Sequence, residues 1–372
     1  MGFLGLFGSS GSKEVNRILK EMAALEEGAE ERSELKDELR QLESNAIEPL
    51  DGWLKRAGKR LPPDWVMLDV CEVLSTLGVD GLQTLAQYAR TDPAERRAAA
   101  LLGLGMSRRE EAVPVCLEAI TTDDPQIVAA ATTALRAIGS GSAVDKLAEL
   151  LKDRSYQVAT RAAIATTIAG LKSAKSAKAI IEAAEDPQLA DVIPGCFGLL
   201  GPLVVPSIID ALGSPNELVR KTMVRALESV GDLGGPDAVQ GIAKALRDRD
   251  SDVRSMAAQA LQKRGEFRPL VASLKDEQFD NRFVLQALTA MGTKNTELMQ
   301  AYASLLEQMG KKITSGSVFA VEKLREAEHF TPALRYLEEV TQYLPDDSDF
   351  MEPAIRLKRE VRTALQSRRS RK

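Results

Sequence analysis

The sequence predicts an all-α protein, a right-handed superhelical solenoid of stacked antiparallel helix pairs with a helical hairpin at its amino terminus. Aromatic residues make up only 4% of its 372 residues, whereas alanine and leucine recur throughout. This composition favours closely packed helices over a large β-sheet core. Glycines that close apolar segments recur every 27 to 34 residues, a period typical of solenoids. These glycines are Gly139, Gly170, Gly201, Gly231, Gly265 and Gly292.

Each repeating unit is predicted to contain a turn that starts a helix and a glycine that ends it. Asp, Asn or Ser before a helix caps free backbone N–H groups, and proline fits the first helical position without losing a hydrogen bond. Within 127–138 the apolar residues follow the three-and-four spacing of one helix face. Because one pair of such helices cannot bury both faces, successive pairs must stack. The predicted turns are Thr91-Asp92-Pro93, Asp123-Asp124-Pro125, Asp153-Arg154-Ser155, Glu185-Asp186-Pro187, Ser214-Pro215-Asn216 and Asp248-Arg249-Asp250.

The pattern divides the chain into six segments. A charged stretch with one narrow apolar stripe predicts a solvated helical hairpin or short coiled coil, and the helices after it, with Trp53 and Trp65, would cap the repeats. The segments are an apolar peptide and Gly/Ser linker (1–12), the charged hairpin (13–44), capping helices around the Leu61-Pro62-Pro63 break (45–78), the repeat array (79–292), carboxy-terminal helices (293–366) and a basic tail (367–372).

Several repeats carry a family resemblance. Three segments resemble the proline-kinked first helix of HEAT repeats, namely 111–120, 203–212 and 267–274. Two others resemble the second helix with its acidic turn and Val-Arg opening, namely 218–227 and 250–261. The units of about 31 residues are most similar to the prokaryotic subgroup named after phycobilisome lyases. The resemblance implies a fold that hosts scaffolds, lyases, hydroxylases and DNA-repair enzymes, so it indicates architecture rather than activity.

Catalytic, metal and cofactor sites are not indicated. His329 is the only histidine, which excludes metal sites that need two histidines. The HEAT-repeat hydroxylases hold iron with repeated His-Glu pairs, and this chain lacks such pairs. Gly103-Leu104-Gly105 lacks the further glycine and the strand of a phosphate loop. The carboxylate pairs Asp123-Asp124 and Asp346-Asp347 are expected in turns, where capping explains them. Three cysteines in apolar helical stretches are expected as buried thiols; they are Cys71, Cys116 and Cys196.

We therefore predict a non-enzymatic scaffold that binds a protein partner on the concave face formed by the second helices. The residues expected on that face are Thr132, Thr133, Thr166, Thr167, Pro194, Arg220 and Arg254. Pro194 would kink a second helix from within and form a hinge or notch, or be a tolerated irregularity. Arg220 and Arg254 would form an anion-binding row or, as the family resemblance implies, an Asp-to-Arg ladder between repeats. The alternatives are a phycobilin lyase or chaperone-like protein and a nucleic-acid-binding HEAT protein.

Two properties of the whole chain bear on location and partners. A net charge of −5 and the lack of interleaved aromatic residues make nucleic acid an improbable partner. No apolar run approaches the roughly 20 residues of a membrane span, so we expect a cytoplasmic protein. The terminal peptide could still dock weakly on a membrane surface or a hydrophobic groove, or have no function of its own. Its docking residues would be Phe3, Leu4, Leu6 and Phe7.

Overall fold

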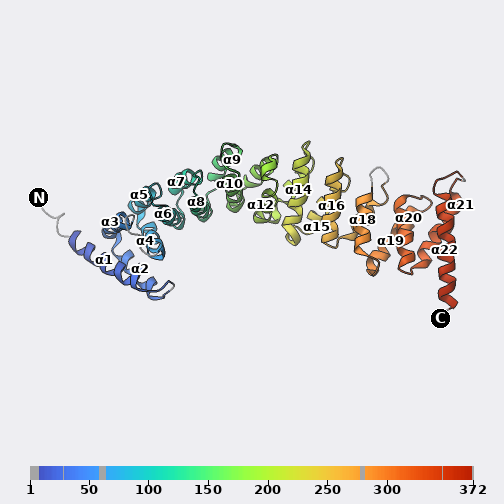
Figure 1. The fold of residues 1–372 in the computed structure, drawn as a ribbon, viewed down its shortest axis with the longest axis horizontal. Helices are drawn as coiled ribbons and strands as arrows, with labels where there is room; N and C mark the ends of the chain where they lie inside the picture. Colours follow the sequence, from blue (N-terminus) through green and yellow to red (C-terminus); the bar gives the residue numbers. More distant parts are fainter. Residues whose placement is uncertain (1–7, 28, 58–63, 277–280, 346, 371–372) are drawn as a thin grey trace. The chain divides into compact units, whose positions relative to one another are not determined.

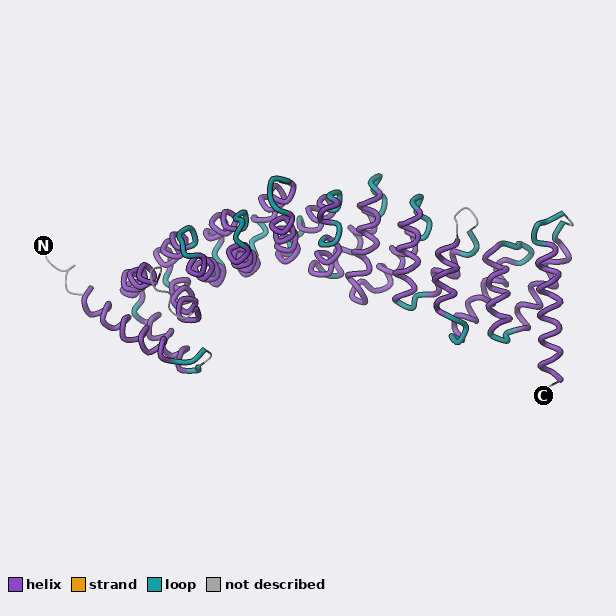
Figure 2. Tube along the Cα trace, viewed as in Figure 1, coloured by secondary structure: helices purple, strands orange, loops and turns teal. Residues whose placement is uncertain are grey.

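The computed structural model describes residues 8–27, 29–57, 64–276, 281–345 and 347–370, and all regular secondary structure in these ranges is helical (Figure 1). The chain divides into two compact units, Met1–Leu200 (unit 1) and Gly201–Lys372 (unit 2). In both units successive helices are joined by loops and pack as neighbouring pairs (Figure 2). The predicted all-α class of stacked helix pairs is therefore confirmed.

Unit 1 is built from two layers of helices. The second helices α4, α6, α8, α10 and α12 pack one against the next, and the first helices α7, α9 and α11 form the other layer. The helices of unit 1 are α1 (Gly8–Ala24), α2 (Glu31–Gln41), α3 (Ile47–Ala57), α4 (Asp64–Thr76), α5 (Gly78–Tyr88), α6 (Ala94–Met106), α7 (Val113–Ala119), α8 (Pro125–Ile138), α9 (Ala143–Lys152), α10 (Val158–Leu171), α11 (Ser176–Ala183) and α12 (Ile193–Leu200).

Unit 2 continues the same local arrangement. Its second helices α14, α16 and α18 pack in sequence, the first helices α13, α15 and α17 lie beside them, and the last four helices pack mainly on one another. The helices of unit 2 are α13 (Val205–Ala211), α14 (Glu217–Val230), α15 (Gly235–Ala245), α16 (Ser251–Lys263), α17 (Phe267–Ser273), α18 (Arg282–Met291), α19 (Thr296–Met309), α20 (Ser315–Glu326), α21 (Phe330–Tyr343) and α22 (Met351–Ser370).

Two glycines of α6 allow its neighbours to pack closely. A Cβ atom at Gly103 would lie 2.8 Å from the Cys71 carbonyl oxygen of α4, and one at Gly105 would lie 2.6 Å from the Ala134 Cα of α8. Both distances are far below van der Waals contact, so only glycine fits. The Gly-Leu-Gly motif that resembled part of a phosphate loop therefore serves helix packing.

Most predicted helix signals are found in the structure. Asp124, Asp186, Asn216 and Asp250 each accept a hydrogen bond from a backbone N–H at the start of a helix or 3-10 turn. Five of the six repeat glycines have positive φ values, which favour glycine; they are Gly139, Gly201, Gly231, Gly265 and Gly292. Gly170 was wrongly predicted to end its helix. It lies inside α10, which ends at Leu171 with Lys172 in the left-handed conformation.

The amino-terminal hairpin is formed by α1 and α2, and it packs on the capping helices α3 and α4. Val15, Ile18 and Met22 are buried, and α1 and α2 contact α3 and α4. The linker expected over 1–12 is helical from Gly8 onward, since α1 begins there. An ion pair between Arg32 and the buried Asp69 links α2 to α4.

At the other end of the chain, the segment expected as a basic tail continues α22 as far as Ser370. Arg368 donates a hydrogen bond from Nη1 to the Glu328 carbonyl oxygen at 2.8 Å. Several predicted features lie outside the described residues, namely Phe3, Leu4, Leu6, Phe7, the Leu61-Pro62-Pro63 break, Asp346 and the last two residues of the tail.

Candidate functional site

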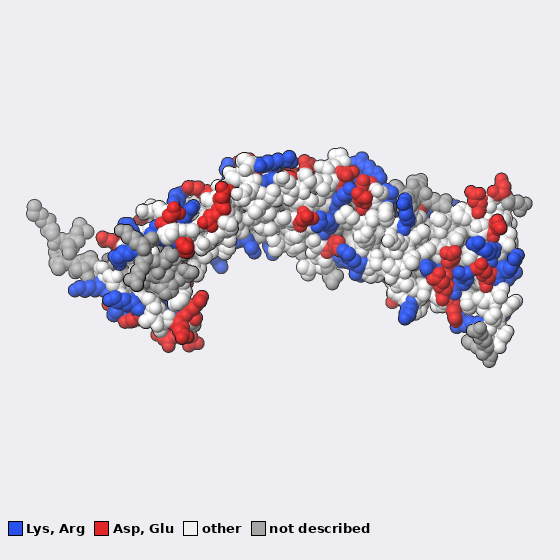
Figure 3. Space-filling model, in the orientation of Figure 1, with Lys and Arg blue, Asp and Glu red and all other residues white. Residues whose placement is uncertain are grey.

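Two second helices of unit 1, α8 and α10, are almost uncharged on their exposed side. The α8 and α10 helices, which pack side by side, expose a single charged side chain, Arg136. In contrast, α9 and α11 expose six, and Figure 3 shows basic side chains along the edge where α9 lies in Figure 1. The exposed charged residues of α9 and α11 are Asp145, Lys146, Glu149, Lys152, Lys178 and Glu182. The two layers of unit 1 therefore present chemically different surfaces.

A groove of about 380 Å³ runs between α8 and α10, and we call it the α8–α10 groove. Its walls are mostly small side chains, because Ala129 and Val128 on α8 face Ala159 and Ala163 on α10. The residues that line it are Asp123, Pro125, Val128, Ala129, Thr132, Thr133, Gln157, Ala159, Thr160 and Ala163. Small side chains at this position leave room for another chain.

The structure brings together only part of the predicted threonine surface. Thr132 and Thr133 line the α8–α10 groove, and Thr132 Oγ1 is buried with no hydrogen-bond partner among the described residues. The Thr133 hydroxyl donates to the Ala129 carbonyl oxygen of its own helix at 2.9 Å. Thr166 lies outside the groove, and Thr167 is fully buried with its hydroxyl bonded to the Ala163 carbonyl oxygen at 2.7 Å. Thr167 therefore offers no surface to a partner.

Pro194 was expected to kink a second helix from within, and that prediction is wrong. The α12 helix begins at Ile193, so Pro194 lies in its first turn, where proline costs no helical hydrogen bond. The preceding residues form a separate 3-10 turn, Pro187–Leu189, instead of the first turns of a longer helix. Pro194 is also buried, which removes it from the candidate partner surface.

Arg220 holds adjacent repeats together, as the ladder implied by the family resemblance requires, whereas Arg254 holds the turn that precedes its own helix. Arg220 is only 3% exposed, and its guanidinium bonds both carboxylate oxygens of Asp248 at 2.8 and 3.0 Å. Arg254 Nη1 donates to the Asp248 and Arg249 carbonyl oxygens at 2.8 and 3.2 Å. The structure therefore shows the ladder at Arg220, while the anion-binding row that would include Arg254 stays a prediction.

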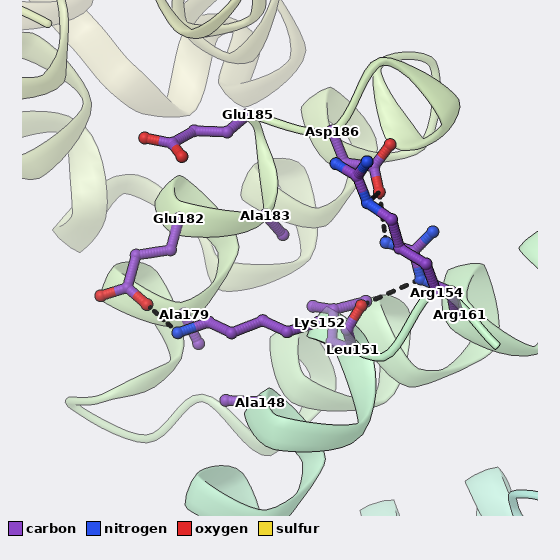
Figure 4. A pocket seen from close by; sticks show the side chains of 10 residues that line it. All are labelled: Ala148, Leu151, Lys152, Arg154, Arg161, Ala179, Glu182, Ala183, Glu185 and Asp186. Atoms are coloured by element: carbon purple, nitrogen blue, oxygen red, sulfur yellow. Dashed lines mark hydrogen bonds and ion pairs between the residues drawn. The ribbon is translucent and has the colours of Figure 1, made fainter. Parts of the chain in front are cut away.

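The same ladder occurs in unit 1 between Arg161 and Asp186. Both residues line a hollow of about 390 Å³ between α9 and α11, which we call the unit-1 hollow (Figure 4). Arg161 is 2% exposed, makes an ion pair with Asp186 and donates from Nε to the Leu151 carbonyl oxygen at 2.9 Å. Lys152 pairs with Glu182 across the hollow at 2.8 Å. Basic and acidic side chains are equal in number around it; they are Lys152, Arg154 and Arg161, then Glu182, Glu185 and Asp186.

The ladder also sets the protonation of its members. Burial of Asp186 favours its neutral form, but hydrogen bonds from Arg161 and the Gln188 backbone amide outweigh burial, so the pKa of Asp186 is lowered. The hydrogen bond to Asp248 raises the pKa of Arg220. Asp186 and Arg220 therefore stay charged at neutral pH, each as a member of a structural ion pair.

The three cysteines are buried and free. Burial raises the pKa of Cys71, Cys116 and Cys196 to about 12 in each case, so the predicted buried thiols are confirmed and stay protonated. No cluster of three or more His, Cys, Asp or Glu side chains suited to a metal ion occurs among the described residues. Nor is any single described helix both long and apolar enough to cross a membrane.

Sequence reasoning missed the alanines that form the groove. Ala129, Ala159 and Ala163 were not among the predicted surface residues, yet the first two are exposed and the third is partly exposed. One signal in the sequence could have identified them. Residues 125–138 and 158–171 contain one charged residue each, in a chain that is 28% charged.

The sequence matches the family described as HEAT repeats at residues 82–166 and 205–292, a little under half of the chain. No curated protein matches it. Similar solved structures include the CpcE–CpcF complex of phycocyanin lyase from Nostoc, 19% identical with a TM-score of 0.30, covering 66% of this chain and 94% of that chain. Human deoxyhypusine hydroxylase is 17% identical with a TM-score of 0.27, covering 68% and 96%. Kap95p, solved with RanGDP, is 14% identical with a TM-score of 0.37, covering 96% and 62%.

Likenesses this distant say nothing about activity, and the lyase-like subgroup stays a prediction. The family match stands on its own and coincides with the stacked helix pairs on both sides of the unit boundary. The chain contains HEAT repeats, at residues 82–166 and 205–292.

Proposed function

We propose that this chain is an interaction scaffold that holds a protein partner on the second-helix face of unit 1. The observation that carries the proposal is the α8–α10 groove, in which Asp123 is the one charged residue among the ten that line it, in a chain whose residues are 28% charged. Away from Asp123, water can leave such a surface without desolvating a charge, which is the main cost of burying ordinary protein surface.

The groove has the features that a protein segment needs. Alanines on both walls allow close approach of another backbone. Val158, the first residue of α10, and Leu199 on the adjacent helix α12 are each 41% exposed. Burial of such apolar surface releases about 25 cal/mol per Å². Thr133 is exposed in the same groove, and its hydroxyl oxygen can accept a hydrogen bond that fixes the register of a bound chain. One exposed basic side chain on α8 and α10 gives no footing for nucleic acid.

The proposal is tested by Ala163→Lys, which places a long cation in the groove. The control is Ala148→Lys on α9, which is the same substitution at another partly exposed helical alanine, on the opposite layer. Proteins captured from native lysate by the wild-type chain and both variants would be compared by quantitative mass spectrometry. Circular dichroism would establish that all three chains are equally helical.

We expect one set of captured proteins to fall at least about tenfold with Ala163→Lys, because a buried unpaired charge costs more than the 1.4 kcal/mol that corresponds to this factor. The same proteins should bind the Ala148→Lys chain as they bind the wild type. Equal capture by both variants would show that the second-helix face of unit 1 is not the docking surface.

A further inference from the structure

We infer that a second hollow, in unit 2, is a binding site for an acidic peptide segment of a protein partner. It has a volume of about 530 Å³, lies between α13 and α15, and is called the unit-2 hollow here. Four of the five charged residues that line it are basic. They are Arg220, Lys244, Arg247 and Arg249, against the single acidic residue Asp248.

The unit-2 hollow is built as the unit-1 hollow is, but two acidic positions at the rim of the unit-1 hollow are basic in unit 2. In both, a buried arginine of the second helix pairs with an aspartate of the next turn, Arg161 with Asp186 and Arg220 with Asp248. Four residues before that aspartate, unit 1 has Glu182 where unit 2 has Lys244. One residue before it, unit 1 has Glu185 and unit 2 has Arg247. Since stacking needs only the buried pair, the reversal at the rim is not explained by the fold.

Two of the four cations have no acidic partner among the residues that the structure describes. Arg220 forms an ion pair with Asp248 and donates hydrogen bonds to the Ser214 and Pro215 carbonyl oxygens. Arg247 forms an ion pair with Asp276 at 2.9 Å. Arg249 donates from Nη2 to the Pro215 carbonyl oxygen at 2.6 Å, a contact that leaves its charge uncompensated. Lys244 is exposed and makes no ion pair with a described residue.

The turn that carries Arg249 is held in place before any ligand arrives. Arg220 binds the side chain of Asp248 from the preceding second helix, and Arg254 binds the carbonyl oxygens of Asp248 and Arg249 from the following one. The Asp250 side chain also caps α16 by accepting from the Val253 backbone N–H at 3.1 Å. A cation on a turn fixed at this many points loses little entropy on binding an anion.

The size and the walls of the hollow favour a peptide over a small anion. A volume of about 530 Å³ is within the range of pockets that enclose multi-atom ligands, and Ile209, Leu212 and Ala245 supply apolar contacts beside the cations. No aromatic residue lines the hollow, so bases of a nucleic acid would have nothing to stack on. A short segment with alternating carboxylate and apolar side chains satisfies both kinds of wall. This inference does not depend on the α8–α10 groove.

The probe is a fluorescein-labelled octapeptide of alternating glutamate and leucine, titrated with the full chain at low salt and followed by fluorescence anisotropy. A second peptide replaces every glutamate with glutamine, and inorganic phosphate serves as a competitor. The test variants are Lys244→Glu and Arg249→Ala. The control is Lys294→Glu, which makes the same change in net charge at another exposed lysine of unit 2 outside the hollow.

We expect the glutamate peptide to bind the wild type and Lys294→Glu alike, and to bind Lys244→Glu about tenfold or more weakly, because a like charge then faces the ligand. Arg249→Ala should weaken binding in the same direction. The glutamine peptide should bind at least about tenfold more weakly than the glutamate peptide. Equal binding of the glutamate peptide to Lys244→Glu and Lys294→Glu, or no binding to the wild type, would overturn the inference. The inference would also be overturned if the glutamate peptide binds no more tightly than the glutamine peptide and phosphate displaces it. The ligand of the hollow would then be a free oxyanion.

Discussion

Replacement of Arg161 by methionine should be among the most destabilising changes at a polar residue of unit 1. Arg161 is 2% exposed and holds three groups, namely the Asp186 carboxylate, the Leu151 carbonyl oxygen at 2.9 Å and the Gln188 side-chain oxygen at 3.3 Å. Methionine fills a similar volume but donates no hydrogen bond. The substitution therefore removes the arginine donor from the buried Asp186 carboxylate and from the Leu151 carbonyl oxygen near the end of α9.

The magnitude follows from what remains around Asp186. Loss of one partner of a buried ion pair costs about 3 to 5 kcal/mol. Asp186 keeps the Gln188 backbone N–H at 3.0 Å, and its side chain is 10% exposed, so we expect the lower end, about 3 kcal/mol. Arg154 also approaches Asp186, at 3.6 Å, but its side chain is 70% exposed. Arg154→Ala should therefore cost no more than about 0.5 kcal/mol.

Urea denaturation followed by circular dichroism at pH 7 measures both changes in the free energy of unfolding. Hydrogen exchange would locate the effect, since the ladder joins α10 to the turn before α12 and its loss should weaken protection in α11 and α12. The double variant Arg161→Met/Asp186→Asn should recover part of the loss, because no charge is then left buried. A cost below about 1 kcal/mol for Arg161→Met, or equal costs for the two arginines, would refute the reasoning.

Two further predictions concern packing and pH. Gly105→Ala should destabilise the chain by about 1 to 3 kcal/mol, because its Cβ would lie 2.6 Å from the Ala134 Cα, whereas Gly195→Ala in α12 meets no atom within 4 Å and should be neutral or stabilising by up to about 1 kcal/mol. Thermal unfolding of the two variants separates these outcomes, and equal melting temperatures would contradict the proposed close contact. Because the pKa of Asp186 is lowered in the folded chain, its contribution is present above the unfolded value near pH 4 and is lost as pH falls below it. The difference in unfolding free energy between the wild type and Asp186→Asn should therefore shrink from pH 7 to pH 3, and a constant difference would show that the carboxylate charge does not stabilise the fold.

Helix positions were largely readable from the residues themselves. Asp124 and Asp250 were predicted to start helices and do so, and Gly139, Gly231 and Gly292 follow directly on the helices that they were predicted to end. These signals depend on residues within one or two turns of each other, so they survive without knowledge of the rest of the chain. The failures are also local in origin. Pro194 lies in the first turn of α12 because the residues before it form a separate turn, and α10 continues through Gly170 to Leu171.

The sequence by itself determined the helix pairs, their period and their order of stacking, because amphipathic spacing and capping residues act within one helix. Only the tertiary structure decided which side chains are free to bind. Arg220 and Arg249 are both arginines near a predicted turn, yet Arg220 is buried by a partner 28 residues further along the chain and Arg249 is exposed. Similarly, the alanines of α8 and α10 form a groove only because those two helices lie side by side. Whether a side chain is buried or paired depends on residues of the adjacent repeat, about 30 residues away in the sequence. A pattern within one helix carries no information about those residues.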